Sequence, residues 1–101
     1  MCKVFVEYTI IHEKRIAYLH YMQKRVEQTG LELFEGTDQP NLFVEIWSNV
    51  SYSAYLSLKE ERLEPVKDSL WEDFEEMVQG GLKKLHIWHF NKPIEFNESS
   101  L

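Results

Sequence analysis

The chain has 101 residues, of which 44% are hydrophobic and 14% aromatic, as is typical of one compact domain. Its 17 acidic and 11 basic residues give a formal net charge of -6, and the basic residues form no stripe. Nucleic acid and anionic membrane surfaces would repel such a protein, so neither is expected as a partner. The sequence contains no cleavable signal pattern and no stretch of membrane-spanning length, which predicts a soluble, cytoplasmic protein.

The first half of the chain begins with an expected strand over residues 3–10, where β-branched and aromatic residues dominate. A helix is predicted from about residue 13 to residue 29, ending before Gly30, because four apolar residues recur at helical spacing: Ile16, Leu19, Met22 and Val26. Two further strands, over 31–36 and 42–48, flank a segment short enough to join them as an antiparallel hairpin.

The second half begins with a helix that Ser48, Asn49 or Ser51 could cap, and that carries Tyr52, Tyr55, Leu56 and Leu63. Pro65 suits the first turn of a second helical segment, whose apolar residues are Val66, Leu70, Phe74, Met77 and Val78. A last strand is expected over 83–90, and residues 91–101 are expected to form an extended or partly disordered tail.

The order strand, helix, strand, strand, helix, strand predicts an α+β fold, the ferredoxin-like split βαβ sandwich, with the first and third strands central in a four-stranded antiparallel sheet. Residues 1–90 would form this single domain. Alternate residues suggest an aliphatic sheet face, including Val4, Val6, Leu42 and Val44, and an aromatic face, including Phe5, Phe43, Trp47 and Trp88. Helices would cover the aliphatic face, and a second subunit is the expected cover of the aromatic one.

The element order, the segment 64–74 and the ending Gly80-Gly81 before the strand at 85–90 resemble the antibiotic-biosynthesis monooxygenase type of dimeric α+β barrel proteins. The resemblance extends over about residues 3–90 and is one of pattern. It implies a homodimer with a ligand cavity between sheet and helices in each protomer. Members of that superfamily include cofactor-independent oxygenases and haem-degrading enzymes. The strand 3–10 lacks the asparagine, and the helical segments after Ser51 lack the histidine, that the haem-degrading members carry.

One candidate cluster combines two carboxylates with an imidazole. Glu7 and Glu45 are expected on the two central strands, pointing to the same face, with His86 on the strand that flanks Glu7. Desolvation among aromatic residues such as Trp47 and Trp88 would favour protonated carboxyl groups, so the cluster would suit a general acid or base. The alternative interpretation is that these residues form polar contacts in a dimer interface, and we favour it because buried charges are kept when they are paired.

A second candidate cluster lies in the expected layer between helices and sheet. Tyr8, His20 and Tyr52 are the predicted catalytic residues, because hydroxyl and imidazole groups would orient a phenolic or quinone-like substrate and move its proton. The alternative is that aromatic residues at helical spacing are simply core. No metal site and no cofactor is expected, since the chain has one cysteine, Cys2, and no helical histidine pair.

Three functions therefore remain open. The first is a cofactor-independent monooxygenase-like enzyme that acts on a small hydrophobic or aromatic molecule. The second is a non-catalytic binder of such a ligand, haem being one possibility. The third is a structural or regulatory homodimer whose interior is fully packed. A polar-lined cavity would favour the first function, and a closed interior would favour the third.

Overall fold

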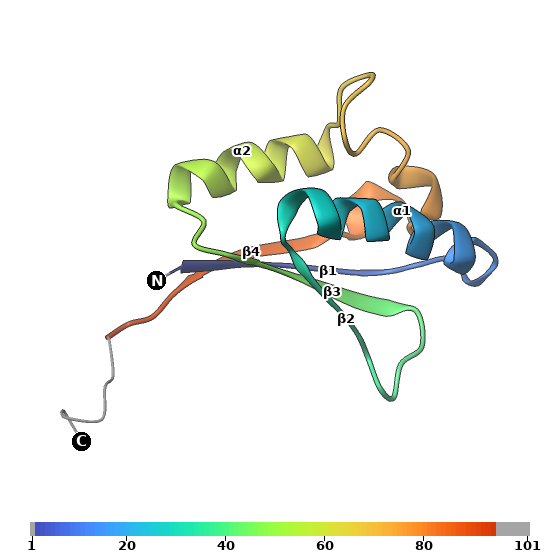
Figure 1. The fold of residues 1–101 in the computed structure, drawn as a ribbon, viewed down its shortest axis with the longest axis horizontal. Coiled ribbons are helices and arrows are strands. Elements are labelled where there is room, and N and C mark those ends of the chain that lie inside the picture. Colours follow the sequence, from blue (N-terminus) through green and yellow to red (C-terminus); the bar gives the residue numbers. More distant parts are fainter. Residues whose placement is uncertain (1, 95–101) are drawn as a thin grey trace.

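The computed structural model describes residues 2–94 and has two helices on one side of a four-stranded antiparallel sheet (Figure 1). The strands are β1 (Cys2–Thr9), β2 (Glu32–Glu35), β3 (Leu42–Ser48) and β4 (His86–Asn91), and the helices are α1 (Arg15–Thr29) and α2 (Tyr52–Leu63). The strand order is β2-β3-β1-β4, so the first and third strands are central, as predicted from the sequence. The ferredoxin-like α+β class is therefore confirmed.

The end of α1 and the start of α2 are set by local backbone and side-chain contacts. The backbone of Gly30 has a φ of 77°, a left-handed conformation that costs glycine little, and α1 ends there. The hydroxyl of Ser51 accepts a hydrogen bond from the backbone N–H of Ala54 at 3.2 Å, which satisfies one of the free amides at the start of α2. Ser51 is thus the N-cap, one of the three residues that the sequence suggested.

The prediction of a second helical segment from Pro65 is wrong. Residues 64–74 form successive turns instead, followed by a short 3₁₀ turn at Glu75–Met77. Asp68 has a φ of 64°, which an α-helix does not accommodate, and the N–H of Ser69 bonds to the carbonyl of Val66, only three residues back. Of the five apolar residues predicted for this segment, Phe74, Met77 and Val78 are buried, but they reach the core from turns, whereas Val66 and Leu70 are 71% and 38% exposed.

The two sheet faces also differ from the prediction. In the β1–β3 register Val6 lies opposite Glu45 and Tyr8 opposite Phe43, so the side chains of Phe43, Glu45 and Trp47 point toward the helices. The alternate residues Leu42, Val44 and Ile46 share the uncovered face with Phe5 and Glu7. Both sides of β3 are rich in apolar residues, so the hydrophobic pattern could not settle which side faces the helices.

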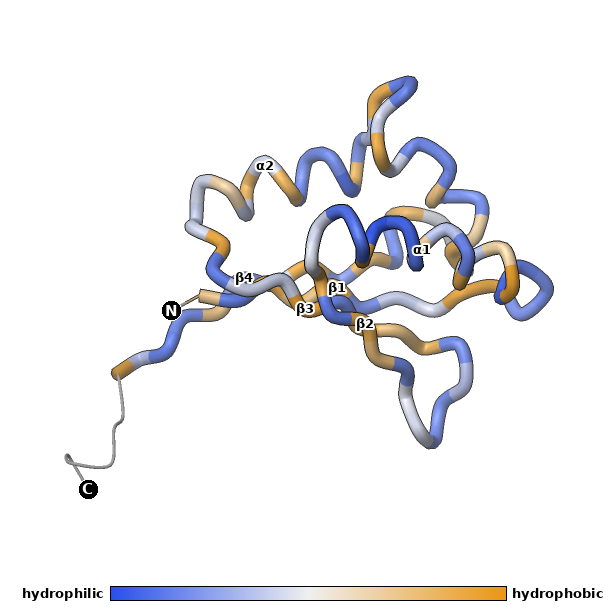
Figure 2. Tube along the Cα trace, viewed as in Figure 1, coloured by the Kyte–Doolittle hydropathy of each residue, from blue (hydrophilic) through white to orange (hydrophobic). Residues whose placement is uncertain are grey.

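The core lies between the helices and the sheet and includes Val4, Val6, Tyr18 and Met22, all fully buried. Hydrophilic residues gather on the helices and at the tip of the β2–β3 hairpin (Figure 2). Within the described residues no helix is long and apolar enough to cross a membrane. The predicted tail begins inside β4, to which Asn91 belongs, and its residues 95–101 lie outside the described part of the chain.

Candidate functional site

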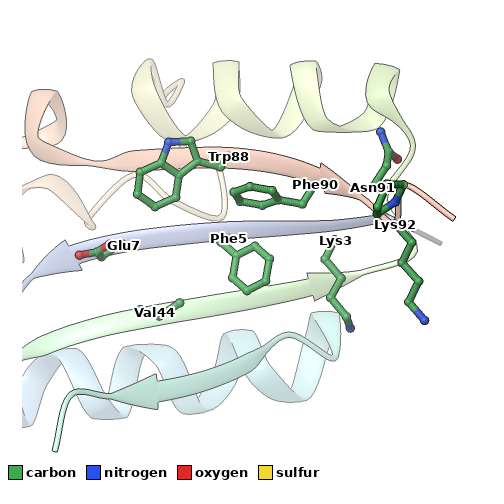
Figure 3. A pocket seen from close by; sticks show the side chains of 9 residues that line it. Lys3, Phe5, Glu7, Val44, Trp88, Phe90, Asn91 and Lys92 are labelled. Atoms are coloured by element: carbon green, nitrogen blue, oxygen red, sulfur yellow. The ribbon is translucent and has the colours of Figure 1, made fainter. Parts of the chain in front are cut away.

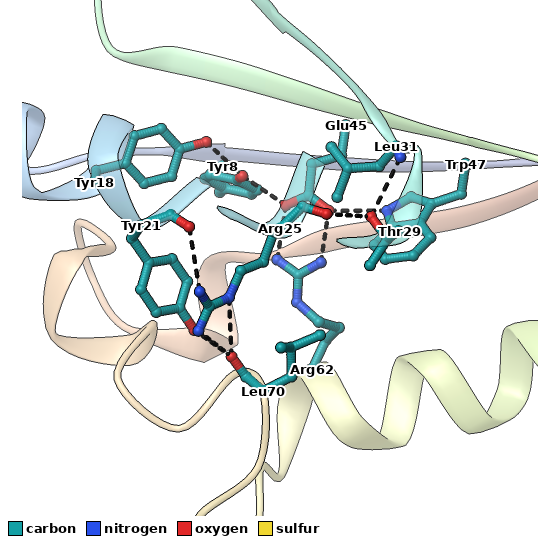
Figure 4. A network of polar contacts seen from close by, with 10 residues as sticks. All are labelled: Tyr8, Tyr18, Tyr21, Arg25, Thr29, Leu31, Glu45, Trp47, Arg62 and Leu70. Carbon is teal, nitrogen blue, oxygen red and sulfur yellow. Dashed lines mark hydrogen bonds and ion pairs between the residues drawn. The ribbon is translucent and has the colours of Figure 1, made fainter. Parts of the chain in front are cut away.

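A buried carboxylate lies at the centre of the layer between helices and sheet. Glu45 on β3 is fully buried and accepts hydrogen bonds from four donors (Figure 4). Its Oε1 is 2.6 Å from Nη1 of Arg62 and 2.9 Å from Nε1 of Trp47. Its Oε2 is 2.8 Å from Nη2 of Arg62 and 2.6 Å from the hydroxyl of Tyr8. This bidentate, fully satisfied geometry is what allows a charged pair to be buried.

Arg62 reaches this carboxylate from the last turn of α2. It is fully buried, and its guanidinium carbon lies 3.6 Å from the ring centroid of Trp71 and 4.6 Å from that of Phe74. Aromatic faces stabilise a cation electrostatically, most strongly where water is excluded. Burial by itself would lower the pKa of Arg62, but the Glu45 carboxylate outweighs that effect and the pKa is raised. The guanidinium therefore stays charged inside the protein.

Two tyrosines extend the cluster toward α1. Tyr8 donates its hydroxyl proton to Glu45, so the Tyr18 hydroxyl, 2.6 Å away, is the donor to Tyr8. Burial raises the pKa of Tyr8 well above its usual value, and the nearby Glu45 carboxylate adds to the effect. Burial likewise raises the pKa of Tyr18. Near neutral pH neither hydroxyl would release its proton.

The irregular segment after α2 covers the cluster. The carbonyl of Leu70 accepts hydrogen bonds from the Tyr21 hydroxyl at 2.7 Å and from Nε and Nη2 of Arg25 at 3.2 and 2.8 Å, which ties the segment to α1 (Figure 4). Between α2 and this segment is a hollow of about 430 Å³ with an acidic wall, lined by Ser57, Glu60, Glu61, Glu64, Val66, Ser69, Leu70 and Trp71. Trp71 thus separates the hollow from the buried guanidinium.

Two buried polar atoms within residues 2–94 have no hydrogen-bond partner, one in the wall of this hollow and one behind Trp71. Among the described residues, Nε of Arg62 and Oγ of Ser69 are the buried side-chain nitrogen or oxygen atoms without a hydrogen bond. Leaving such a group unpaired in the interior costs about 1–3 kcal/mol. A ligand or water molecule that entered from the hollow would meet Ser69 first, and would reach Arg62 only if Trp71 moved.

The uncovered face of the sheet carries a second hollow, of about 630 Å³ (Figure 3). Its walls include Phe5, Val44, Trp88 and Phe90, with Lys3, Glu7 and Lys92 as charged members. Phe34, Trp88 and Phe90 on this face are 53%, 43% and 53% exposed. Phe5 and Phe90 meet edge to face with ring centroids 5.3 Å apart. Solvent-exposed aromatic surface of this extent usually marks an interface or a binding site.

The structure separates the residues that the sequence grouped. Glu7 lies opposite His86 on the uncovered face, as expected, but Glu45 and Trp47 lie on the helix side, so the prediction that Glu7 and Glu45 share a face is wrong. Trp88 is on the uncovered face and its ring stacks on that of His86.

The three predicted catalytic residues do not converge. Tyr8 is buried in the cluster, whereas His20 is exposed on α1 and Tyr52 is 61% exposed at the start of α2. The ring of Tyr52 contacts Tyr55 and His89. Within residues 2–94 no group of three or more histidine, cysteine or acidic residues is arranged to hold a metal ion.

Sequence reasoning missed Tyr18, Arg62 and Trp71. The sequence did contain a signal that Arg62 is buried. Arg62 follows Leu58 by four residues, and Leu58 follows Tyr55 by three, so all three lie on the same, core-facing side of α2. A glutamate in the middle of an apolar central strand also requires a buried cation. Trp71 gave no such signal, since its place over Arg62 depends on the turns after α2.

A second arginine–glutamate pair lies at the surface and allows a test of pH dependence. Arg15 on α1 makes a bidentate contact with Glu35 at the end of β2, and Glu35 also accepts a hydrogen bond from the N–H of Asn41. Arg15, followed by the Asn41 amide, lowers the pKa of Glu35 from 4.5 to about 2.

The contribution of this pair to stability should be complete above about pH 4.5 and should vanish as the pH falls through about 2. The wild-type protein and Glu35→Gln should accordingly differ less in urea midpoint as the pH falls from about 4.5 to about 2. Carboxyl ¹³C NMR titration of Glu35 provides the direct check. A midpoint near 4.5 in the folded protein would contradict the expectation.

Comparison with known proteins places the fold. The chain is similar to the crystal structure of an antibiotic biosynthesis monooxygenase, with a TM-score of 0.69 and 18% sequence identity, over 91% of this chain and 98% of that one. The resemblance expected from the sequence is thereby confirmed at the level of fold. No protein-family model and no curated protein matches the sequence.

Proposed function

We propose that this protein is a homodimer, formed where the uncovered sheet faces of two copies pack together, and that each protomer binds a small hydrophobic or aromatic molecule. The observation that carries the dimer is the uncovered aromatic face, on which Phe34, Trp88 and Phe90 are each more than 40% exposed. Full burial of one large apolar side chain is worth about 1.5–3 kcal/mol, so several together would offset the entropy lost in association.

Ligand binding is supported by the hollow between α2 and the following segment. Its volume of about 430 Å³ falls within the range of small-molecule sites, and an aromatic wall at Trp71 adjoins the unpartnered hydroxyl of Ser69. Because Trp71 is 2% exposed and the Ser69 oxygen is buried, a flat aromatic molecule with one polar group would reach the indole and that hydroxyl only with a movement of the segment that carries them. Both features concern the same short segment, residues 69–71.

Between binding and turnover, the cluster around Glu45 favours binding. The raised pKa values of Tyr8 and Tyr18 keep both hydroxyl protons in place at neutral pH. All four hydrogen-bonding positions of the Glu45 carboxylate are used within the protein. A monooxygenase-like reaction is the second candidate, and the similarity to a monooxygenase structure is the finding that favours it.

Ser57 and Ser53 on α2 offer a matched test of the binding site. Ser57 lines the hollow and is exposed, whereas Ser53 is exposed on the same helix outside the lining. Ser57→Trp should obstruct the hollow and weaken binding of 2-naphthol or 1,4-naphthoquinone by about tenfold or more, while Ser53→Trp should bind like wild type. Calorimetric titration gives the affinities, and amide NMR shifts locate the probes.

The same probes distinguish the two candidate functions. Binding without oxygen consumption in a sealed electrode cell supports a binder, and consumption of oxygen together with loss of the probe supports the monooxygenase-like reaction. If neither probe shifts the amides of residues 69–71 at about 1 mM, the proposed ligand site is wrong, since even weak specific sites bind near that concentration.

A further inference from the structure

The uncovered sheet face holds an acidic side chain without a partner. Glu7 is half-buried on β1, and its carboxylate makes no hydrogen bond or ion pair to any described residue. His86 lies opposite on β4, but its ring stacks on Trp88, with centroids 5.5 Å apart. On the same strand Lys3 points to the same face, where its ammonium group donates a hydrogen bond to Ser48.

Lys3, Phe5 and Glu7 stand in a row along β1, with the aromatic ring in the middle (Figure 3). Alternate strand residues are about 6.6–6.8 Å apart, so the positive and negative side chains are equally far from Phe5. A charge pattern of this kind is complementary to its own reverse. It would fit a second copy of the same strand running in the opposite direction across the interface.

We propose that Lys3 of each subunit pairs with Glu7 of the other in the homodimer. This inference rests on the proposed function, because it requires two sheet faces to pack together. A two-fold axis that lies between the sheets and crosses β1 at Phe5 reverses the strand, and each lysine then comes over the opposite subunit's glutamate. With the strands stacked parallel, lysine would meet lysine and glutamate would meet glutamate.

The energetics select the first arrangement. Packing two aromatic faces together removes water from Glu7, and a carboxylate that loses water without gaining a partner is strongly penalised. The second subunit's Lys3 supplies the missing cation in two symmetry-related positions at once. Phe5 and Trp88, which lie opposite each other in the β1–β4 register, then form the apolar centre between the two pairs.

Charge reversal tests the pairing by sedimentation equilibrium of the full-length chain. Lys3→Glu and Glu7→Lys each place like charges together and should raise the dimer dissociation constant by about tenfold or more, whereas the double reversal should return it to within about threefold of wild type. Lys24→Glu, an exposed lysine on α1, is the control and should leave the constant unchanged. Circular dichroism confirms that each variant is folded.

Two neutral variants test the same pairing without placing like charges together. Lys3→Gln and Glu7→Gln should not be additive, because each alone already removes the pair. A double reversal that dimerises no better than the single variants, or additive effects of the neutral variants, would overturn the pairing and leave the dimer standing. A wild-type protein that is monomeric at about 100 μM would overturn both the pairing and the dimer.

Discussion

Replacement of Arg62 by alanine is expected to destabilise the folded protein by about 3–5 kcal/mol, the usual cost of breaking a buried ion pair from one side. The variant would leave the Glu45 carboxylate buried without its bidentate cation and would remove the group that fills the space beside Trp71. Because typical domains are stable by only about 5–15 kcal/mol, a loss of this size would be evident in any unfolding experiment.

The matched control is Arg15→Ala. Arg15 forms the same bidentate contact with Glu35, but its side chain is 34% exposed, whereas that of Arg62 is fully buried. Water and salt screen an exposed pair, so Arg15→Ala should cost far less than Arg62→Ala. Urea unfolding at one fixed protein concentration measures both. Equal effects of the two variants would show that burial of the Arg62 pair is not what sets its importance.

Replacement of Trp88 by alanine is expected to weaken the proposed dimer by about 2 kcal/mol or more, equivalent to about 30-fold in the dissociation constant. Trp88 lies beside Phe90 on the uncovered face and is 43% exposed in the protomer, so its truncation removes contact area between the subunits and little from the core. Tryptophan at the centre of an interface is among the most frequent sites of large effects.

Tyr52→Ala is the control for that experiment. Tyr52 is also aromatic and is 61% exposed, but it lies on α2, on the other side of the sheet. Sedimentation equilibrium should therefore give a wild-type dissociation constant for Tyr52→Ala. Should both aromatic variants weaken association alike, the interface would not be the uncovered sheet face.

Within the described residues, the layer between sheet and helices contains no open cavity of the kind that the family resemblance led us to expect. The expected cavity between sheet and helices is filled by the side chains of Tyr18, Arg62, Trp71 and Phe74, none of which is more than 2% exposed. A ligand that reached the buried guanidinium would have to displace Trp71. The fold is thus shared with an antibiotic biosynthesis monooxygenase, and in this chain side chains fill the layer between sheet and helices.

The sequence predicted the elements well wherever a local signal existed. Helical spacing and Gly30 located α1 and its end, the strand 42–48 was predicted with the bounds of β3, and the element order led to the correct sheet. The second helical segment failed because apolar residues at helical spacing occur equally in a chain of turns whose side chains reach the core. Asp68 in a left-handed conformation could not be foreseen from that spacing.

The candidate site was only partly predictable. Glu7 and His86 were correctly placed on neighbouring strands, and Tyr8 was correctly assigned to the layer between helices and sheet. The partner of Glu45 was missed, since it depends on which side of β3 faces the helices, and both sides of that strand are apolar enough to be buried. The catalytic role of Tyr8, His20 and Tyr52 stays a prediction.

What the sequence determined by itself is therefore the four strands, the two α-helices and the fold, but not the turns after α2, because hydrophobic period, caps and turn residues act over a few residues. Only the tertiary structure decided the strand register that turns the Glu45 side chain toward the helices. It also decided the position of α2 over the sheet, which brings Arg62 to the Glu45 carboxylate. Those contacts join residues distant in the chain, and their energies depend on burial, which no local pattern specifies.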